Sequence, residues 1–403
     1  MTPLKAVDEA LAEICRTIAP LTPVKVSLGQ ALGHVVAEDI IAGTHHPLSD
    51  MSAMDGYGVR SCDIEAGKPL QVVGESAAGH PYRLPLEENQ AVRIYTGAYV
   101  PEHCDAIILQ EDVTETDGVI MPPAPVEAGR FIRKRGQDFK RDDILVPKGA
   151  RMTARAMALA ALGLQSQAVI QRQPHIAILS SGDELVKAGG IPRFGQLINS
   201  NAVFLCAALE QAGAQVTDLG ILPDETGALQ KAIPDAGAYD LIITTGGASV
   251  GKYDYIVSDL EDGAQSRLDF WKIAMRPGKP LIFGAIGETP LIGLPGNPVS
   301  VAVCSLVFLR PIIGHMMGRD DLSLIPQEAV CTRDLAQNDQ RQDYLRAIAE
   351  TKDGVWHITP FEKQDSAMLH KLSQANALLI RPAFDDAIAA GDTVTMALLP
   401  DNF

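Results

Sequence analysis

Hydrophobic and polar positions change their period along the chain. Val7, Leu11, Ile14 and Ile18 recur at the spacing of one helix face, which predicts an amphipathic N-terminal helix. From about residue 22 to residue 150, short apolar runs are separated by Gly, Pro and Asp, which is typical of a β-rich region. The elements expected there and just after it are strands at 70–73, 91–95 and 106–109, a helix at 154–164 and a strand at 167–171.

From about residue 174 strands alternate with helices, which predicts a mainly parallel, doubly wound α/β sheet. Its predicted strands lie at 176–179, 215–219, 241–244, 281–283 and 290–294, and its helices at 201–212, after Glu225, after Gly246-Gly247 and at 299–317. After about residue 323 the chain returns to short strands, which predicts a small all-β domain. These strands lie at 344–349, 354–358, 377–380 and 393–398.

Composition narrows the function. The chain has 403 residues, too many for one ordinary core, so two to four domains are expected. Hydrophobic residues make up 46% and charged residues 21%, a normal globular profile. The net charge of −16 argues against nucleic acid or an acidic membrane as the main partner. An anionic ligand would therefore be held locally, by Lys or Arg, by backbone N–H groups, or by a divalent metal on carboxylates.

Six scattered cysteines without a CxxC motif indicate reduced thiols in a cytoplasmic protein. The N-terminus has the pattern of an amphipathic helix rather than a signal peptide. The longest apolar run, 299–309, is short of the roughly 20 residues that span a bilayer. We therefore expect a soluble cytoplasmic protein.

The segment from Leu294 to Ser300 is the most informative in the chain. A predicted strand turns through Pro-Gly-Asn-Pro into a predicted helix, which exposes backbone N–H groups at a positive helix end, where oxyanions bind. Two cationic side chains lie just upstream. The substrate-binding residues predicted here are Arg276, Lys279, Pro295, Gly296, Asn297, Pro298 and Ser300.

Three further strand ends carry glycine with hydroxyl or acidic residues. Because the carboxyl ends of parallel strands meet at one edge of a sheet, we expect all of them to face one crevice. Alone, each motif is as consistent with a helix cap or a tight turn; together they favour a site. The residues are Ser181, Gly182, Asp183 and Glu184 after the first strand, Asp224 after the second, and Gly246, Gly247, Ser249 and Asp254 after the third.

Carboxylates beside an anion site favour a bridging divalent cation. Magnesium takes oxygen ligands and binds phosphates, so we expect Mg²⁺ on some of Glu184, Asp224 and Asp254. In the β-rich region, Asp55 lies in an Asp-Gly turn and Thr96 precedes a glycine at a strand end. From the residues alone, these two loops have only a weak functional signal.

In this order, these motifs and others resemble the molybdopterin molybdenumtransferase family, which is related to the C-terminal domain of gephyrin. The matching strings lie at 52–57, 96–98, 135–138, 181–185, 195–201, 244–251, 275–280 and 294–300. The resemblance implies a homodimeric enzyme that inserts molybdate into adenylylated molybdopterin, with Mg²⁺, and yields molybdenum cofactor and AMP. By motif match, it implies five catalytic residues, namely Asp55, Thr96, Glu184, Asp224 and Asp254.

The resemblance also implies a domain plan. A central α/β domain similar to molybdopterin adenylyltransferases is joined by a β-rich inserted domain and a C-terminal β-barrel. As a mechanistic hypothesis, we expect Asp55 and Thr96 to complete the crevice from a neighbouring domain, that of the partner subunit. Protein partners would be the adenylyltransferase and cofactor-delivery proteins. The expected boundaries are 1–20 for an N-terminal helix, 21–46 with 140–173 for a linker and dimerisation domain, 47–139 for the insertion, 174–320 for the α/β domain and 321–403 for the barrel.

Two other functions stay open. An adenylyltransferase that makes the activated pterin from ATP would share the α/β domain but would not need the Asp55 and Thr96 loops. A non-catalytic, gephyrin-like scaffold would share the whole fold but would not need the acidic residues.

Overall fold

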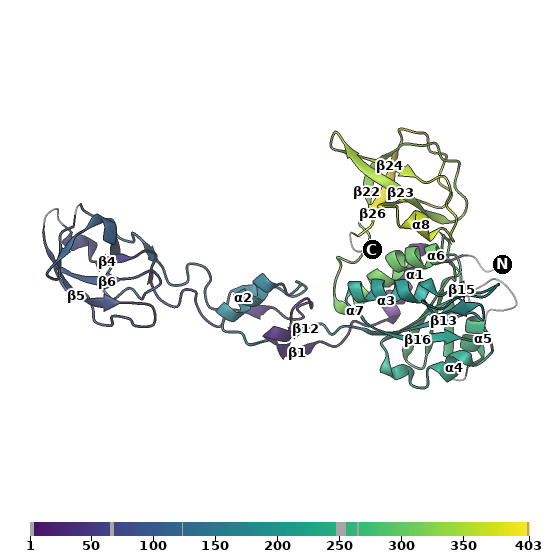
Figure 1. Ribbon diagram of the computed structural model, residues 1–403, viewed down its shortest axis with the longest axis horizontal. Coiled ribbons are helices and arrows are strands. Elements are labelled where there is room, and N and C mark those ends of the chain that lie inside the picture. Colours follow the sequence, from purple (N-terminus) through teal and green to yellow (C-terminus); the bar gives the residue numbers. More distant parts are fainter. Residues whose placement is uncertain (1–3, 65–67, 123, 247–254, 264–265, 401–402) are drawn as a thin grey trace. The chain divides into compact units, whose positions relative to one another are not determined.

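The computed structural model describes the chain except residues 1–3, 65–67, 123, 247–254, 264–265 and 401–402. The chain forms two compact units (Figure 1). One contains Met1–Pro23 and Gln171–Phe403, and the other is Val24–Ile170.

The first unit contains a six-stranded sheet in the order β16-β13-β17-β21-β20-β18. Four of its strands are parallel, namely β13 (His175–Ser181), β16 (Gln215–Leu222), β17 (Leu241–Thr245) and β21 (Thr289–Leu294). β20 (Ile282–Ile286) runs antiparallel to both β21 and β18 (Ser266–Phe270). β20 and β21 form a hairpin because the two residues between them are too few for a crossover helix. The predicted doubly wound α/β class is confirmed, with this antiparallel strand as a difference.

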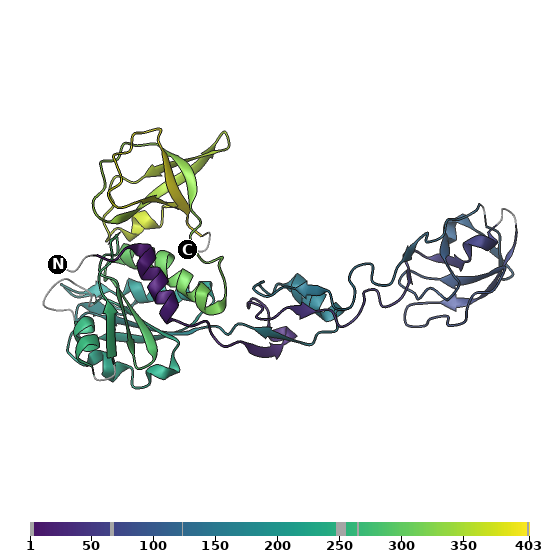
Figure 2. The same ribbon diagram turned by 180° about the vertical axis from the view of Figure 1, so that it is seen from behind.

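Helices cover both faces of the sheet (Figures 1 and 2). The strands are buried on both sides, so Ile176 and Ile178 pack on one face while Ala177 and Leu179 pack on the other. The first face carries α1 (Val7–Thr17), α3 (Ser200–Ala212) and the helix at Pro298–Met317, and the second carries α4 (Ala228–Ala232) and α5 (Tyr255–Asp262).

The helix at Pro298–Met317 lies in the core of the α/β domain. It comprises α6 (Pro298–Cys304), a π-helical turn (Ser305–Leu309) and α7 (Arg310–Met317). Its length and composition would suit a membrane span, but 89% of its most apolar window is buried inside the protein. The segment that follows α1 covers part of this helix. There, Leu21 N donates to Met316 O at 2.9 Å, and His315 Nε2 lies 2.8 Å from Ile18 O. Burial on all sides explains why the helix has no polar face.

The C-terminal domain is a closed barrel, as predicted. Each of its five strands pairs with two others, in the cyclic order β23-β24-β22-β26-β25. The strands are β22 (Gln327–Cys331), β23 (Gln342–Lys352), β24 (Val355–Pro360), β25 (Ala377–Arg381) and β26 (Thr393–Leu398), with α8 (Leu369–Leu372) between β24 and β25. A short strand of the α/β domain, β19 (Met275–Arg276), pairs in parallel with β23 and so joins the two domains.

The second unit is β-rich, as predicted. Its first part contains the pairs β1 (Val24–Ser27) with β12 (Gln167–Ile170) and β2 (Ile40–Ile41) with β11 (Ile144–Val146), and α2 (Ala154–Leu162). Its second part contains a sheet in the order β7-β4-β6-β5-β9-β8 and the pair β3 (Met51–Ser52) with β10 (Ile132–Arg133). The strands of that sheet are β4 (Gly56–Val59), β5 (Leu70–Ser76), β6 (Gln90–Ile94), β7 (Ala106–Leu109), β8 (Glu115–Thr116) and β9 (Val119–Ile120). All six cysteines are free thiols.

Candidate active site at the carboxyl edge of the sheet

The four strand ends singled out in the sequence lie at one edge of the sheet. Ser180 is in register with Thr245, Thr245 with Leu294, and Ser181 with Leu222. The loops that follow β13, β16, β17 and β21 are therefore neighbours. Three predicted residues of this edge, Gly247, Ser249 and Asp254, lie outside the described residues.

Hydrogen bonds fix the first two loops to each other. Ser181 Oγ donates to Asp224 Oδ1 at 2.8 Å, and Asp224 N donates to Asp183 Oδ1 at 3.1 Å. Ser181 is buried whereas Asp183 is exposed. The two predicted acids are thus oriented by the adjoining loop.

Two of the predicted glycines allow close approach. Gly182 has φ +151°, and a Cβ atom there would lie 2.7 Å from a carboxylate oxygen of Glu184. Gly246 has φ +83°, and a Cβ atom there would lie 2.2 Å from the carbonyl oxygen of Ser181. At Gly246 any side chain would collide with the backbone of the neighbouring loop, whereas at Gly182 it is the positive φ that favours glycine, because the nearby Glu184 side chain is exposed and can move.

Magnesium fits this edge only if the protein supplies one or two carboxylates and the substrate supplies further oxygen ligands. The exposed Glu184 and the partly buried Asp224 offer the carboxylate oxygens that Mg²⁺ prefers, on neighbouring loops. In the described part of the chain, however, no three His, Cys, Asp or Glu side chains gather at metal-binding spacing, and Asp254 lies outside that part. Mg²⁺ often binds one or two carboxylates and completes its shell with phosphate oxygens and water.

The loop Pro295-Gly296-Asn297-Pro298 follows β21, and we call it the proline loop. Its carbonyl groups point into the protein. Four consecutive carbonyls, from Leu294 to Asn297, accept hydrogen bonds. In the same order, their donors are Gly246 N (3.3 Å), Thr245 Oγ1 (3.1 Å), Asn201 Nδ2 (2.8 Å) and Val301 N (3.0 Å).

The N–H groups of this loop are thereby left for a ligand. Pro295 and Pro298 have no N–H. Val299 N donates to Ser366 O of the barrel at 3.0 Å. Among the described residues, the N–H groups of Gly296 and Asn297 have no acceptor, and both residues are exposed at the start of the long helix. These two N–H groups are available to an oxyanion.

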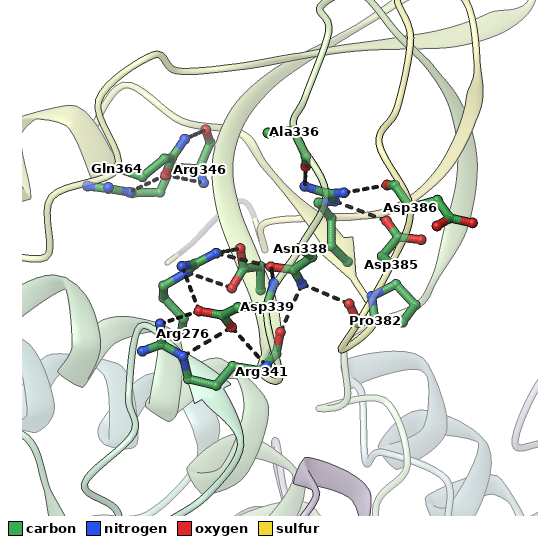
Figure 3. Close-up of polar contacts among 12 residues, drawn as sticks. Arg276, Ala336, Asn338, Asp339, Arg341, Arg346, Gln364, Pro382, Asp385 and Asp386 are labelled. Carbon is green, nitrogen blue, oxygen red and sulfur yellow. Dashed lines mark hydrogen bonds and ion pairs between the residues drawn. The ribbon is translucent and has the colours of Figure 1, made fainter.

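The other three residues predicted to bind substrate differ in their charge partners and in their exposure to solvent. Arg276 Nε donates to Asp343 Oδ1 at 2.7 Å, Nη2 contacts Asp343 Oδ2, and further bonds reach Asn338 (3.1 Å) and Asp339 (3.3 Å) (Figure 3). The bonds to Asp343 raise the pKa of Arg276. Lys279 has no ion pair within the described ranges. Ser300 is only 4% exposed.

The barrel contributes residues that the sequence did not suggest. Arg346 is 1% exposed and donates to Gln364 Oε1 at 3.1 Å and to Asp365 O at 2.9 Å (Figure 3). Burial lowers the pKa of Arg346. These bonds hold the segment whose Ser366 carbonyl meets the start of α6. An arginine among the apolar residues of a predicted strand was the available signal.

In the second unit, Asp55 and Thr96 are in contact. Asp55 Oδ1 accepts hydrogen bonds from Thr96 N at 2.7 Å and from Thr96 Oγ1 at 2.8 Å. These two bonds lower the pKa of Asp55. Nearby, the guanidinium of Arg93 lies over the rings of Tyr57 (4.9 Å) and Tyr95 (5.2 Å) and lines an open cavity of about 820 Å³. The two loops with the weakest signal in the sequence therefore form one unit of structure.

Three family matches together cover most of the chain. Residues 5–163 match the MoeA N-terminal region (domain I and II), residues 177–315 a probable molybdopterin binding domain, and residues 328–399 the MoeA C-terminal region (domain IV). The molybdopterin molybdenumtransferase of Haemophilus influenzae is 36% identical over 376 residues, which cover 92% of each chain.

The chain belongs to the MoeA family.

A second relative, the molybdopterin molybdenumtransferase of Bacillus subtilis, is 32% identical over 98% of this chain and 94% of its own. Two crystal structures of a molybdopterin biosynthesis MoeA protein from Pyrococcus horikoshii align with 98% of this chain at TM-scores of 0.87 and 0.77, with 27% and 25% identity. The two alignments cover 99% and 100% of the Pyrococcus horikoshii chains. The described strand-end loops fall inside the match to the probable molybdopterin binding domain, residues 177–315.

Proposed function

We propose that this MoeA-family chain is a molybdopterin molybdenumtransferase. It inserts molybdate into adenylylated molybdopterin, with magnesium, and releases AMP to give molybdenum cofactor. It works as a cytoplasmic homodimer. The names of the relatives support the reaction class, and the proline loop with its two outward N–H groups is the single observation that most supports an oxyanion substrate.

Both substrates carry tetrahedral oxyanions. The N–H groups of Gly296 and Asn297, at the positive end of the helix at Pro298–Met317, would bind one of them. Lys279 supplies a positive charge on the preceding loop that no carboxylate among the described residues neutralises. Arg276 was also predicted to bind molybdate, but it shares its charge with Asp343, so Lys279 is the stronger candidate for the anion.

Release of AMP breaks the P–O bond between the AMP phosphorus and the oxygen that bridges to the phosphate of the pterin. When a water molecule attacks that phosphorus, AMP leaves directly. When a molybdate oxygen attacks it, the Mo–O bond of the resulting adenylyl molybdate breaks as the dithiolene sulfurs bind molybdenum, and AMP leaves. Glu184 and Asp224, together with Asp254, would hold Mg²⁺, which when bound neutralises the charge that develops on the phosphates. Asp55, whose pKa the hydrogen bonds from Thr96 lower, stays ionised and belongs to the proposed catalytic set together with Thr96.

The test is AMP release from purified protein given adenylylated molybdopterin and Mg²⁺, with and without molybdate. The proposal expects release that depends on molybdate, with molybdenum recovered in the pterin. Consumption of ATP with free molybdopterin would instead assign the chain as an adenylyltransferase. Tight pterin binding with neither activity would assign a carrier or scaffold.

A further inference from the structure

The orientation of the proline loop depends on a side chain from another element. Asn201, the second residue of α3, donates through Nδ2 to Gly296 O at 2.8 Å and to Thr245 Oγ1 at 3.0 Å. Thr245 Oγ1 in turn donates to Pro295 O at 3.1 Å. Both hydrogens of the Asn201 amide are therefore used, and one short chain of hydrogen bonds anchors two consecutive carbonyls.

Peptide geometry converts these anchors into a binding surface. In a trans peptide unit, a carbonyl and the N–H of the next residue point to opposite sides of the chain. Because the Pro295 carbonyl points at Thr245, the N–H of Gly296 points away from Thr245. Because the Gly296 carbonyl points at Asn201, the N–H of Asn297 points away from Asn201. These are the two N–H groups that have no acceptor among the described residues.

The position of Asn201 is itself set by the loop that carries Glu184. Leu197 N donates to Glu184 O at 2.8 Å, and β14 (Leu185–Val186) pairs in parallel with β15 (Leu197–Ile198). Asn199 then caps α3, because its Oδ1 accepts from Ala202 N at 3.2 Å. The loop with the proposed metal ligand and the loop with the proposed anion site are therefore joined through the start of α3.

We infer that Asn201, acting through Thr245, is a positioning residue that holds the N–H groups of Gly296 and Asn297 toward a tetrahedral oxyanion. This rests on the proposed function for the identity of the oxyanion, which is molybdate or a phosphate of the adenylylated pterin. Neither Asn201 nor Thr245 was among the residues predicted from the sequence to bind substrate.

The first test is Asn201→Ala, with molybdate binding measured by calorimetry and AMP release measured at varied molybdate and pterin concentrations. Loss of the amide should weaken molybdate binding about tenfold and raise the corresponding KM by the same factor, with kcat within about threefold of wild type. If the KM for the adenylylated pterin rises instead, and molybdate binding does not, the oxyanion is a phosphate. Unchanged binding of both substrates would overturn the inference.

The matched control is Asn199→Ala, which removes the α3 cap two residues away and leaves the Asn201 amide in place. It should lower the stability of α3 without the tenfold effect on the anion. An equal loss of anion binding in both variants would overturn the inference, because it would reduce Asn201 to a helix-stabilising role.

A pH profile separates positioning from packing. In Asn201→Asp, the ionised carboxylate cannot donate to the Gly296 carbonyl, so anion binding should be weakest near neutral pH. It should recover as pH falls toward about 4, where the protonated carboxyl can donate, whereas Asn201→Ala should show no such recovery. Equal profiles for the two variants would count against the inference. Should the Asn201 variants fail to fold, Thr245→Val should weaken binding more than Thr245→Ser, which keeps the hydroxyl.

The inference and the proposed function can fail separately. If wild-type protein binds molybdate and the Asn201 variants weaken that binding, the inference stands even when no AMP is released. If AMP is released normally but the variants bind and react like wild type, the proposed function stands and the inference falls.

Discussion

Arg276 of the α/β domain and Asp343 of the C-terminal barrel form an ion pair with two contacts, one of them 2.7 Å long. The Asp343 side chain is 2% exposed, whereas that of Arg276 is 43% exposed. The pair extends the pairing of β19 with β23, where Arg276 and Asp343 are also in register. A cation that the sequence predicted to bind the substrate thus fastens the barrel to the α/β domain.

Arg276→Gln should lower the free energy of unfolding by about 1–3 kcal/mol, because the buried Asp343 would lose its cation; the exposure of Arg276 keeps the loss below that of a fully buried pair. Urea denaturation measures it. The control is Arg267→Gln, which breaks the more exposed pair with Asp269 and should cost below about 1 kcal/mol. Equal losses would contradict a special role for the pair.

Glu184→Ala should fold normally, since Glu184 is exposed, and should release AMP about 10²-fold more slowly, because the proposed Mg²⁺ site loses a carboxylate. Initial rates of AMP release measure the effect. Glu225→Ala removes another exposed acid, paired only with Lys231 among the described residues, and should react at the wild-type rate. Near-normal release by Glu184→Ala would remove this residue from the mechanism.

The pKa of Asp55 is held below its ordinary range by hydrogen bonds from Thr96, so Asp55 stays ionised further into acid than a free aspartate. A lowered pKa in the folded state makes these bonds favourable above the unfolded pKa, and their contribution is lost as pH falls through the folded pKa. Thr96→Ala removes one bond and should move the pKa upward, along with the acid limb of the rate profile.

Carbon-13 NMR titration of the Asp55 carboxyl measures this change directly, and Asp55→Asn identifies the signal. An unchanged pKa in Thr96→Ala would show that the backbone N–H of Thr96 alone determines it. An acid limb that is identical in wild type and Asp55→Asn would remove Asp55 from the rate-limiting chemistry.

Gly246→Ala should destabilise the α/β domain by about 1–3 kcal/mol or prevent its folding, because φ is +83° and the new Cβ would lie 2.2 Å from Ser181 O. Gly296→Ala is the matched comparison, since its nearest neighbour would be 3.6 Å away, and its melting temperature should stay close to wild type. Equal melting temperatures for the two variants would contradict this assignment of the Gly246 backbone.

The fold was largely predictable because local periodicity determines it. The strand-helix alternation after residue 174 predicted the sheet, and with it the meeting of Ser181, Asp224 and Pro295 at one edge. The antiparallel β20 was missed, because a short apolar run does not show its direction. The distances between the loops could not be predicted either, because they depend on tertiary structure. The same holds for the contact between Asp55 and Thr96 in the second unit.

The residues missed at the site have partners far away in the sequence. Arg276 and Asp343 are 67 positions apart, and Asn201 and Gly296 are 95 apart. An asparagine at a helix start ordinarily indicates a cap, which Asn199 provides, so nothing local distinguished Asn201 as the residue that contacts another loop. A buried carboxylate in a barrel strand was equally unremarkable until its cation was located.

The packing of α1 on the helix at Pro298–Met317 has a consequence for biosynthesis. Helix α1 is made about 300 residues before the helix at Pro298–Met317, and the β-rich unit is made between them. Until then the apolar side of α1 lacks the cover that this helix gives it, and the long apolar helix itself is made before the barrel that follows it. Translation of this protein therefore exposes apolar segments from the beginning and from the end of the α/β domain. The yield of folded protein in cells should depend on chaperones that bind nascent chains.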